Sequence, residues 1–203
     1  MAKVALIGAS GNAGSRILKE LSDRGHEVTA IARSPEKIAQ LPGVTALKGD
    51  AQDGAALAGL LRGHDAVVSS TRFTGTDFSI ITDALREAGV SRYLVVGGAA
   101  SLEVAPGQRL LDQPDFPEAY KEEATHGAAT LDYLRDLDGL DWTFLSPSAM
   151  FEPGERTGTF RLGKDELLSN ENGSRISFED YAIAMVDEIE NPKHTRQRFT
   201  VGY

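Results

Sequence analysis

The chain has 203 residues, of which 41% are hydrophobic and 25% charged, a composition typical of a globular protein with a substantial core. The formal net charge of −9 argues against sequence-independent nucleic-acid binding, which requires a basic surface, and favours solubility. Cysteine is absent, which excludes disulfides, thiolate metal ligands and a cysteine nucleophile. No apolar run approaches the ~18 residues of a membrane span. The N-terminus lacks a signal-peptide pattern, so we expect a cytoplasmic protein without membrane contact.

Apolar runs alternate with helical patterns through the first two thirds of the chain. In chain order we expect strand 3–8, helix 13–24, strand 27–32, a short helix 35–40, strand 44–48, helix 54–61, strand 66–69, helix 77–88, strand 93–96, helix 120–137 and strand 142–145. The strands are near-continuous runs of Val, Ile, Leu and Ala, as in a sheet that is buried on both faces. The alternation predicts an α/β fold with a doubly wound parallel sheet of the Rossmann type.

From Pro147 onward the pattern changes. The stretch PSAMFEPGERTGTFRLG is rich in Pro and Gly and predicts a loop with a short strand. A helix is expected at 177–188, with Ser177 as its N-cap and Asp180 completing a loose capping box, and a closing strand at 198–201. No repeat or linker divides the chain. We therefore expect one domain over 1–203, in which 147–175 forms most of a small C-terminal lobe on the substrate side.

The segment GASGNAG lies between the first expected strand and the first expected helix. Gly8 permits an unusual φ at the turn, Gly11 lets the backbone approach a pyrophosphate, and Gly14 lets helix and strand pack closely. The helix N-terminus offers unpaired N–H groups to phosphates. The spacing is GxxGxxG, one residue longer than GxGxxG, and a tight turn without ligand is the alternative. The predicted cofactor-binding residues of this loop are Gly8, Ser10, Gly11, Asn12, Ala13 and Gly14.

The end of the second expected strand indicates which dinucleotide binds. Proteins selective for NAD place Asp or Glu roughly 20 residues after the glycines to hold the ribose 2′-hydroxyl. Here the segment reads IARSP and contains no carboxylate. Arg33 can pair with a 2′-phosphate and Ser34 can add a hydroxyl, which favours NADP, used as NADPH, with NAD as the alternative cofactor. An ordinary surface role for Arg33 stays open.

The ends of the later strands extend the same groove, because carboxyl ends of parallel strands share one edge of the sheet. Asp50 can accept a hydrogen bond from the adenine amino group. The small residues at the other ends let the chain pass beneath the ribose and wall the nicotinamide. The predicted cofactor-binding residues at these ends are Asp50, Ala51, Ser69, Ser70, Thr71, Gly97, Gly98, Pro147 and Ser148.

Together these segments resemble the atypical short-chain dehydrogenase/reductases, and among them the NADH–flavin reductase group, with flavin/biliverdin reductases and NmrA-like proteins as further relatives. The resemblance extends over nearly the whole chain, through VALIGASGNAGSRIL, LDQPDFPEAYKEEA, PGERTGTFRLGKDELL and SRISFEDYA. It implies a single Rossmann-type domain with a small lobe over the nicotinamide. It also implies nicotinamide-dependent reduction of flavins, quinones or similar conjugated acceptors.

The superfamily's catalytic pair is a Tyr followed four residues later by a Lys, which lowers the tyrosine pKa for proton donation. Tyr120 stands near the start of the corresponding helix, but the residue four positions later is Ala124. Lys121 points about 100° away around a helix. The resemblance makes Tyr120 and Ser101 catalytic candidates, while a helix-start aromatic and a loop hydroxyl without catalytic roles are the alternatives.

The missing lysine bears on the type of reaction. Reduction of a simple carbonyl develops alkoxide charge that benefits from a positioned acid. A flavin or quinone spreads the incoming charge over its rings and can take its proton from water, so proximity supplies much of the rate. We therefore expect a reductase of a small conjugated acceptor. The aromatic residues in expected loops that can line an acceptor pocket, or only pack, are Phe73, Phe116, Phe151 and Phe160.

Other functions were weighed against this one. An NmrA-like sensor that binds the dinucleotide without turnover remains the main alternative, since the catalytic pair is incomplete. A nucleotide-sugar epimerase or dehydratase fits less well, because the lobe is small. No paired-histidine spacing, GxSxG or Walker motif is present, so we expect no metal site, hydrolase or nucleotide triphosphatase. The sequence does not indicate an oligomeric state.

Overall fold

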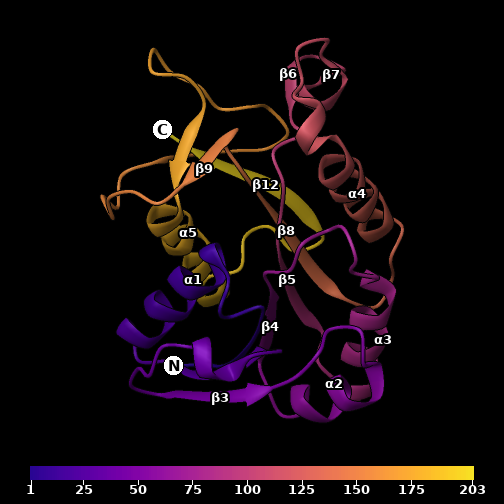
Figure 1. Cartoon of the computed structure of the whole chain (residues 1–203), viewed down its shortest axis with the longest axis vertical. Coiled ribbons are helices and arrows are strands. Elements are labelled where there is room, and N and C mark those ends of the chain that lie inside the picture. The colour runs from indigo at the N-terminus through magenta and orange to yellow at the C-terminus, as the bar shows by residue number, and fades with distance from the viewer.

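The computed structural model describes all 203 residues, and its main feature is one eight-stranded sheet (Figure 1). In sheet order its strands are β10 (Arg161–Gly163), β12 (Gln197–Gly202), β8 (Asp141–Pro147), β5 (Arg92–Val96), β4 (Ala66–Ser69), β1 (Lys3–Ile7), β2 (Glu27–Ala32) and β3 (Val44–Lys48). Neighbouring strands run parallel except β10, which pairs antiparallel with β12. The predicted parallel sheet is confirmed.

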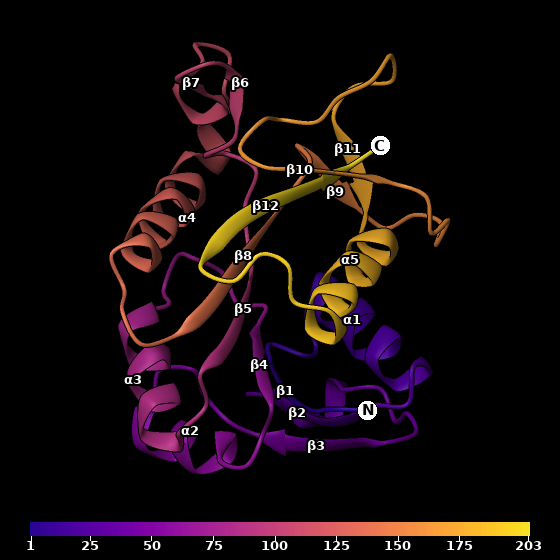
Figure 2. The ribbon, with the colours of Figure 1, turned by 180° about the vertical axis from the view of Figure 1, so that it is seen from behind.

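Helices cover both faces of this sheet (Figures 1 and 2). On one face lie α1 (Asn12–Asp23) and α5 (Phe178–Glu190), and on the other lie α2 (Gly54–Leu61), α3 (Phe78–Ala88) and α4 (Glu118–Arg135). Each face has its own apolar core, of 26 and 21 buried residues, so the sheet is buried on both sides. The burial explains why the central strands are continuous apolar runs. The doubly wound Rossmann-type fold is confirmed.

The order in which the strands are added to the sheet reverses between β1 and β4, although these strands run parallel. From β1 the chain proceeds outward to β2 and β3, then crosses back to β4 on the other side of β1 and continues to β5 and β8. In register, Ile7 of β1 lies opposite Ser69 of β4, so both strands end at the same level. Their following loops leave in opposite directions, and a crevice at the carboxyl ends is the expected ligand position.

Most expected elements lie within two residues of their expected bounds, but the helix expected at 35–40 is wrong. Only one 3₁₀ turn, η1 (Pro35–Lys37), forms there. Ile38 is already extended and buries its side chain in the core. Pro42 disfavours the helical conformation at Leu41, and six residues are too few to nucleate a helix.

Beyond the main pattern the sequence predicted one short strand, in the segment that begins at Pro147, and the structure has more short strands than this. A hairpin of β6 (Glu103–Ala105) and β7 (Gln108–Arg109), followed by the 3₁₀ turn η2 (Leu110–Asp112), stands between β5 and α4. Within the segment expected to form the lobe, β9 (Met150–Glu152) pairs with β11 (Arg175–Ser177), while β10 joins the main sheet. The segment is therefore attached to the sheet, and its assignment as a lobe stays a prediction.

The start of α5 shows how this segment is attached. The Ser177 hydroxyl accepts a hydrogen bond from the Asp180 N–H at 2.9 Å, which is the predicted N-cap. The Asp180 carboxylate does not complete the capping box. It is fully buried and accepts hydrogen bonds from the Gly158 N–H and the Thr157 and Tyr203 hydroxyls. Asp180 therefore anchors the loop before β10 and the last strand to α5.

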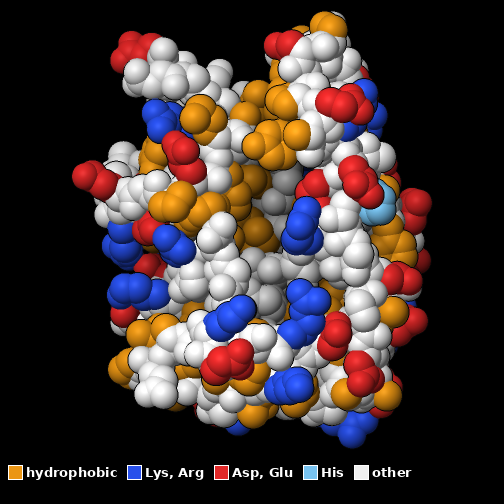
Figure 3. Space-filling view, viewed as in Figure 1, with side chains coloured by type: hydrophobic (Ala, Val, Ile, Leu, Met, Phe, Trp, Pro, Cys, Tyr) orange, Lys and Arg blue, Asp and Glu red, His pale blue; other side chains and the backbone are white.

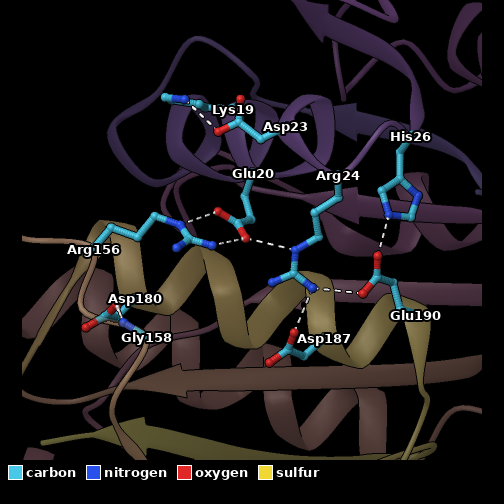
Figure 4. A network of polar contacts seen from close by, with 10 residues as sticks. All are labelled: Lys19, Glu20, Asp23, Arg24, His26, Arg156, Gly158, Asp180, Asp187 and Glu190. Atoms are coloured by element: carbon cyan, nitrogen blue, oxygen red, sulfur yellow. Dashed lines mark hydrogen bonds and ion pairs between the residues drawn. The ribbon is translucent and has the colours of Figure 1, made fainter.

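A network of ion pairs joins α1, α5 and the loop that carries Arg156 (Figure 4). The Glu20 carboxylate, with a side chain 4% exposed, accepts two hydrogen bonds from Arg156 and one from Arg24, each of 2.8 Å. Arg24 also pairs with Asp187 and Glu190 of α5. The hydrogen bonds from Arg156 lower the pKa of Glu20, burial opposes this, and Arg24 adds to the lowering. The ionised form of Glu20 thus stabilises the contact between helix and loop.

The variant Glu20→Gln tests this linkage. Because the pKa of Glu20 is lower in the folded chain, its ionised form stabilises the fold above the ordinary pKa of 4.5, and this stability is lost as the pH falls through the lowered value. We expect the variant to lose about 1–3 kcal/mol at neutral pH, and the deficit to shrink toward about pH 3. Urea unfolding at the two pH values measures both free energies. An equal deficit at both would contradict the linkage.

Candidate functional site

Two adjoining hollows lie at the carboxyl ends of the strands. The first, of ≈ 420 Å³, is lined by the loops after β1, β2, β3 and β4, and we name it the glycine-loop groove. The second, of ≈ 570 Å³, is lined by the loops after β5 and β8, by Phe73 and by one face of α4, and we name it the apolar pocket. Both volumes lie within the range of small-molecule sites, about 300–1,000 Å³.

Two glycines of the loop are required by close backbone approaches. Gly8 has a φ of +80°, and a Cβ added there would lie 2.2 Å from the carbonyl oxygen of Ser70. A Cβ at Gly14 would lie 2.2 Å from the carbonyl oxygen of Gly8. These two glycines therefore serve the turn and the helix–strand packing with or without a ligand. Gly11 is different, since it is exposed and its φ of −74° suits any residue.

The N-terminus of α1 lacks any capping group. Its N-cap is Gly11, so no side chain accepts from the first turn, and that turn contains no acidic residue. The N–H groups of residues 12–14 have no backbone acceptor. In contrast, α2, α3 and α5 are capped by Asp53, Asp77 and Ser177. Unpaired donors at the positive end of the helix dipole make an anion site.

The other walls of the groove include three polar residues, Thr71, Arg33 and Asp50. The Thr71 hydroxyl, after β4, is buried and has no hydrogen-bond partner, an expensive state unless a ligand or water supplies one. Arg33 is exposed at the end of β2 and forms no ion pair within the chain. Asp50, after β3, uses one carboxylate oxygen for the N–H of Gln52 and is otherwise free.

The predicted site residues divide between the two hollows. Those that line the glycine-loop groove are Gly8, Ser10, Gly11, Arg33, Asp50, Ala51, Ser70 and Thr71. Those that line the apolar pocket are Gly97, Gly98, Ser101, Tyr120, Pro147 and Ser148. Those that line neither are Asn12, Ala13, Gly14, Ser34 and Ser69.

Two of the predicted serines direct their hydroxyls away from the hollows. The Ser69 hydroxyl is buried and lies 2.8 Å from the Tyr93 hydroxyl. The Ser148 hydroxyl is buried and donates to the Val201 carbonyl at 3.0 Å. At the strand ends these two serines therefore contribute only their small size, because their hydroxyls are not available to a ligand.

The apolar pocket is walled by aromatic rings. Phe73, Phe116 and Phe151 line it, as the sequence allowed, while Phe160 does not. The Phe73 ring lies against Gly127 of α4, where an added Cβ would approach it to 3.0 Å. A small residue at this position lets helix and ring pack closely. Flat apolar walls suit a planar ring system.

Tyr120 lies on the rim of the apolar pocket without an activating partner. Its side chain is 66% exposed, and its hydroxyl forms no hydrogen bond within the chain. Ala124, one turn later, also lines the pocket, so the superfamily's lysine position faces the site but carries no charge. Lys121 instead approaches Glu118 at 3.4 Å. The chain supplies no cation beside the Tyr120 hydroxyl.

Ser101 has a buried cationic neighbour that sequence reasoning missed. The Arg198 guanidinium on β12 is 3% exposed and donates to the Ser101 hydroxyl at 3.1 Å and to Ser146 at 3.3 Å. Asp165 accepts two further hydrogen bonds from the guanidinium, at 2.8 and 2.6 Å, and the Ser101 carbonyl oxygen accepts one at 3.4 Å. Because Ser101 accepts from Arg198, its own proton is free to point into the pocket. An Arg within an apolar strand pattern was the available signal.

Glu123 of α4 is a second residue that the sequence did not reveal. Its carboxylate accepts from the N–H groups of Phe73 and Thr74 at 2.7 and 2.9 Å, and from the Thr74 hydroxyl. Burial raises the pKa of Glu123, but these hydrogen bonds and nearby Arg72 outweigh it and lower the pKa below its ordinary value. The ionised carboxylate therefore holds the loop after β4 against α4.

The fold and the glycine-loop groove define a dinucleotide-binding protein of the Rossmann type. The sequence matches the NAD(P)H-binding family over residues 8–192, and the chain belongs to that family. No helix combines the length and apolarity needed to cross a membrane.

Three solved structures share the fold along their whole length. One from Burkholderia pseudomallei, whose name proposes an exported protein, is 46% identical with a TM-score of 0.90, covering 100% of both chains. One from Bacteroides thetaiotaomicron, whose name proposes an epimerase, is 42% identical with a TM-score of 0.94, covering 100% of this chain and 97% of that one. One from Streptococcus pneumoniae TIGR4, whose name proposes an NADH-flavin reductase, is 39% identical with a TM-score of 0.87, covering 100% and 99%.

These similarities confirm the resemblance to the NADH–flavin reductase group. The residues present also fit a dinucleotide. The uncapped α1 N-terminus suits a pyrophosphate, and the unpartnered Thr71 hydroxyl suits a ligand that crosses the end of β4. A cytoplasmic location stays a prediction.

The variant Gly11→Asp separates folding from dinucleotide binding. An Asp at the N-cap satisfies the free N–H groups, so we expect unchanged or slightly higher thermal stability. Its charge competes with the phosphates for the same donors, so we expect the Kd for NADPH to rise about tenfold or more. Gly11→Asn, with the same shape and no charge, is the matched control and should weaken binding less. Calorimetric titration of both variants measures this, and equal losses would argue against an anion at this helix.

Proposed function

We propose that the chain is an NADPH-preferring oxidoreductase that reduces a conjugated acceptor such as a flavin or quinone. The observation that carries the proposal is the aromatic-walled pocket that adjoins the glycine-loop groove, with no lysine beside Tyr120. The Streptococcus pneumoniae relative, whose name proposes an NADH-flavin reductase, supports the same class. NADP is the proposed cofactor, and NAD is the alternative.

The chain's residues would bind and orient the reactants. Gly11 and the free N–H groups of residues 12–14 would hold the pyrophosphate, and Asp50 would accept from the adenine amino group. Gly97, Gly98 and Pro147 would form the small-residue floor beneath the nicotinamide. NADPH supplies a hydride, that is, two electrons and one proton, and one further proton from solvent completes the reduced acceptor. Proximity of stacked rings supplies much of the rate.

Ser101 would direct its hydroxyl proton toward a carbonyl oxygen of the acceptor. Arg198 donates to the Ser101 oxygen and is itself paired with Asp165, which leaves the Ser101 proton for another acceptor. The Ser101 hydroxyl would thus donate to the oxygen on which negative charge develops. Tyr120 is less suited to this role, because no lysine lies beside it. Tyr120 would then serve mainly as part of the aromatic wall of the pocket and not as a proton donor.

Arg33 is proposed to select the 2′-phosphate. It lines the groove without an ion-pair partner, and Ser34 follows it at the half-buried cap of η1. We expect NADPH to bind about tenfold or more tightly than NADH, and Arg33→Ala to erase most of that difference by weakening NADPH alone. Calorimetric titration with both cofactors is the measurement. Equal affinities in the unmodified protein would refute the role of Arg33.

The activity is tested by NADPH oxidation with a panel of flavins and quinones. We expect turnover with at least one conjugated acceptor and none with simple aldehydes or ketones. Ser101→Ala should lower kcat by about tenfold with little change in the Kd for NADPH, whereas Tyr120→Phe should change kcat less than about threefold. Binding of NADPH without turnover of any acceptor would reject the enzyme and leave the dinucleotide sensor as the function.

A further inference from the structure

The two hollows differ sharply in charge. The glycine-loop groove is lined by two arginines, Arg33 and Arg72. The apolar pocket has no Lys, Arg or His among its lining residues, and its two ionisable carboxylates are Asp115 and Glu123. Figure 3 shows the same separation, with apolar side chains gathered in the upper hollow and Lys and Arg side chains on the surface below it. Arginines therefore line the groove where phosphates of a dinucleotide would bind, and none lines the pocket where an acceptor would bind.

The carboxylates make the pocket unfavourable for an anion. Glu123 is kept ionised by its hydrogen bonds, and both its oxygens already accept from the loop after β4, so its negative charge remains. Asp115 is exposed at the rim and has no hydrogen-bond or ion-pair partner within the chain. Arg72 approaches Glu123 only to 3.9 Å and is 82% exposed, so solvent screens it.

An anionic group that enters the pocket would lose hydration and gain little in return. The walls are aromatic and aliphatic, and the two carboxylates among the lining residues repel it. Arg198 lies behind Ser101, and Asp165 already pairs with its charge. A neutral conjugated ring buries mostly apolar surface in the pocket, which is favourable, and Ser101 can donate to one of its carbonyl oxygens. We propose that the apolar pocket takes an uncharged conjugated acceptor, of the unphosphorylated flavin or alkylquinone class, and rejects acceptors that carry phosphate, sulfonate or carboxylate on the ring. This proposal rests on the proposed function for the acceptor's place in the reaction.

The test compares 2-methyl-1,4-naphthoquinone with 1,4-naphthoquinone-2-sulfonate, which share one ring system and differ in charge. The sulfonate is the stronger oxidant, so a pocket without charge preference would favour it in turnover. Binding is measured by calorimetric titration of the protein saturated with NADP⁺, where no hydride can move. Turnover is measured separately as kcat/KM with NADPH, after subtraction of the uncatalysed rate. We expect the neutral quinone to bind about tenfold more tightly and to have the higher kcat/KM.

Two variants locate the charge effect. Asp115→Lys places a cation on the pocket rim and should improve sulfonate binding about fivefold or more, with little change for the neutral quinone. Glu122→Lys is the matched control, because Glu122 lies exposed on α4 outside the pocket lining and the net charge changes equally. At about 0.15 M salt it should change neither quinone's Kd more than twofold.

The outcomes are distinguishable. Equal or tighter binding of the sulfonate, equal effects of the two lysine variants, or no binding of either quinone would overturn the charge proposal. Neutral-quinone binding with the expected selectivity but no NADPH oxidation would support the pocket's preference and reject the reductase as its use.

Discussion

The close approach of the chain at Gly8 to the carbonyl oxygen of Ser70 constrains the rest of the structure. It occurs where β1 and β4 end side by side, at the point where the strand order of the sheet reverses. A side chain at Gly8 would collide with Ser70, and the positive φ at Gly8 turns the chain into α1. The same geometry places the helix start beside the loop of Thr71, so Gly11, the N-cap of α1, and Thr71 line one groove.

Local patterns predicted the sheet because burial on both faces requires continuous apolar runs. Residues 3–7, 27–32 and 66–69 could therefore be placed without any knowledge of their neighbours. The Ser177 cap was also local, since its acceptor and donor lie three residues apart. The helix expected at 35–40 failed because the gain from burying Ile38 in an extended conformation exceeded a weak helical preference. The 103–109 hairpin has no regular apolar alternation to reveal it.

The site was predicted to the extent that it follows from strand ends. Gly8 and Arg33 could be assigned to one groove because parallel strands finish at a common edge. The residues that set the chemistry of the pocket could not be assigned from the sequence, because their partners are remote along the chain. Arg198 contacts Ser101 across 97 positions, and Glu123 contacts Phe73 across 50. Asp180 could not be predicted correctly for the same reason. A local capping role was expected, but its carboxylate oxygens accept from residues that are remote in the sequence.

Ion pairs fix the second half of helix α1: Glu20 pairs with Arg156, and Arg24 pairs with two acidic residues of α5. The first turn of α1, in contrast, has no side chain that caps it. The donors at that turn are thus oriented when the chain folds. A phosphate that arrives there need not order the helix, and little conformational entropy is lost at the moment of binding. The ion pairs at one end of α1 make the other end a preorganised receptor.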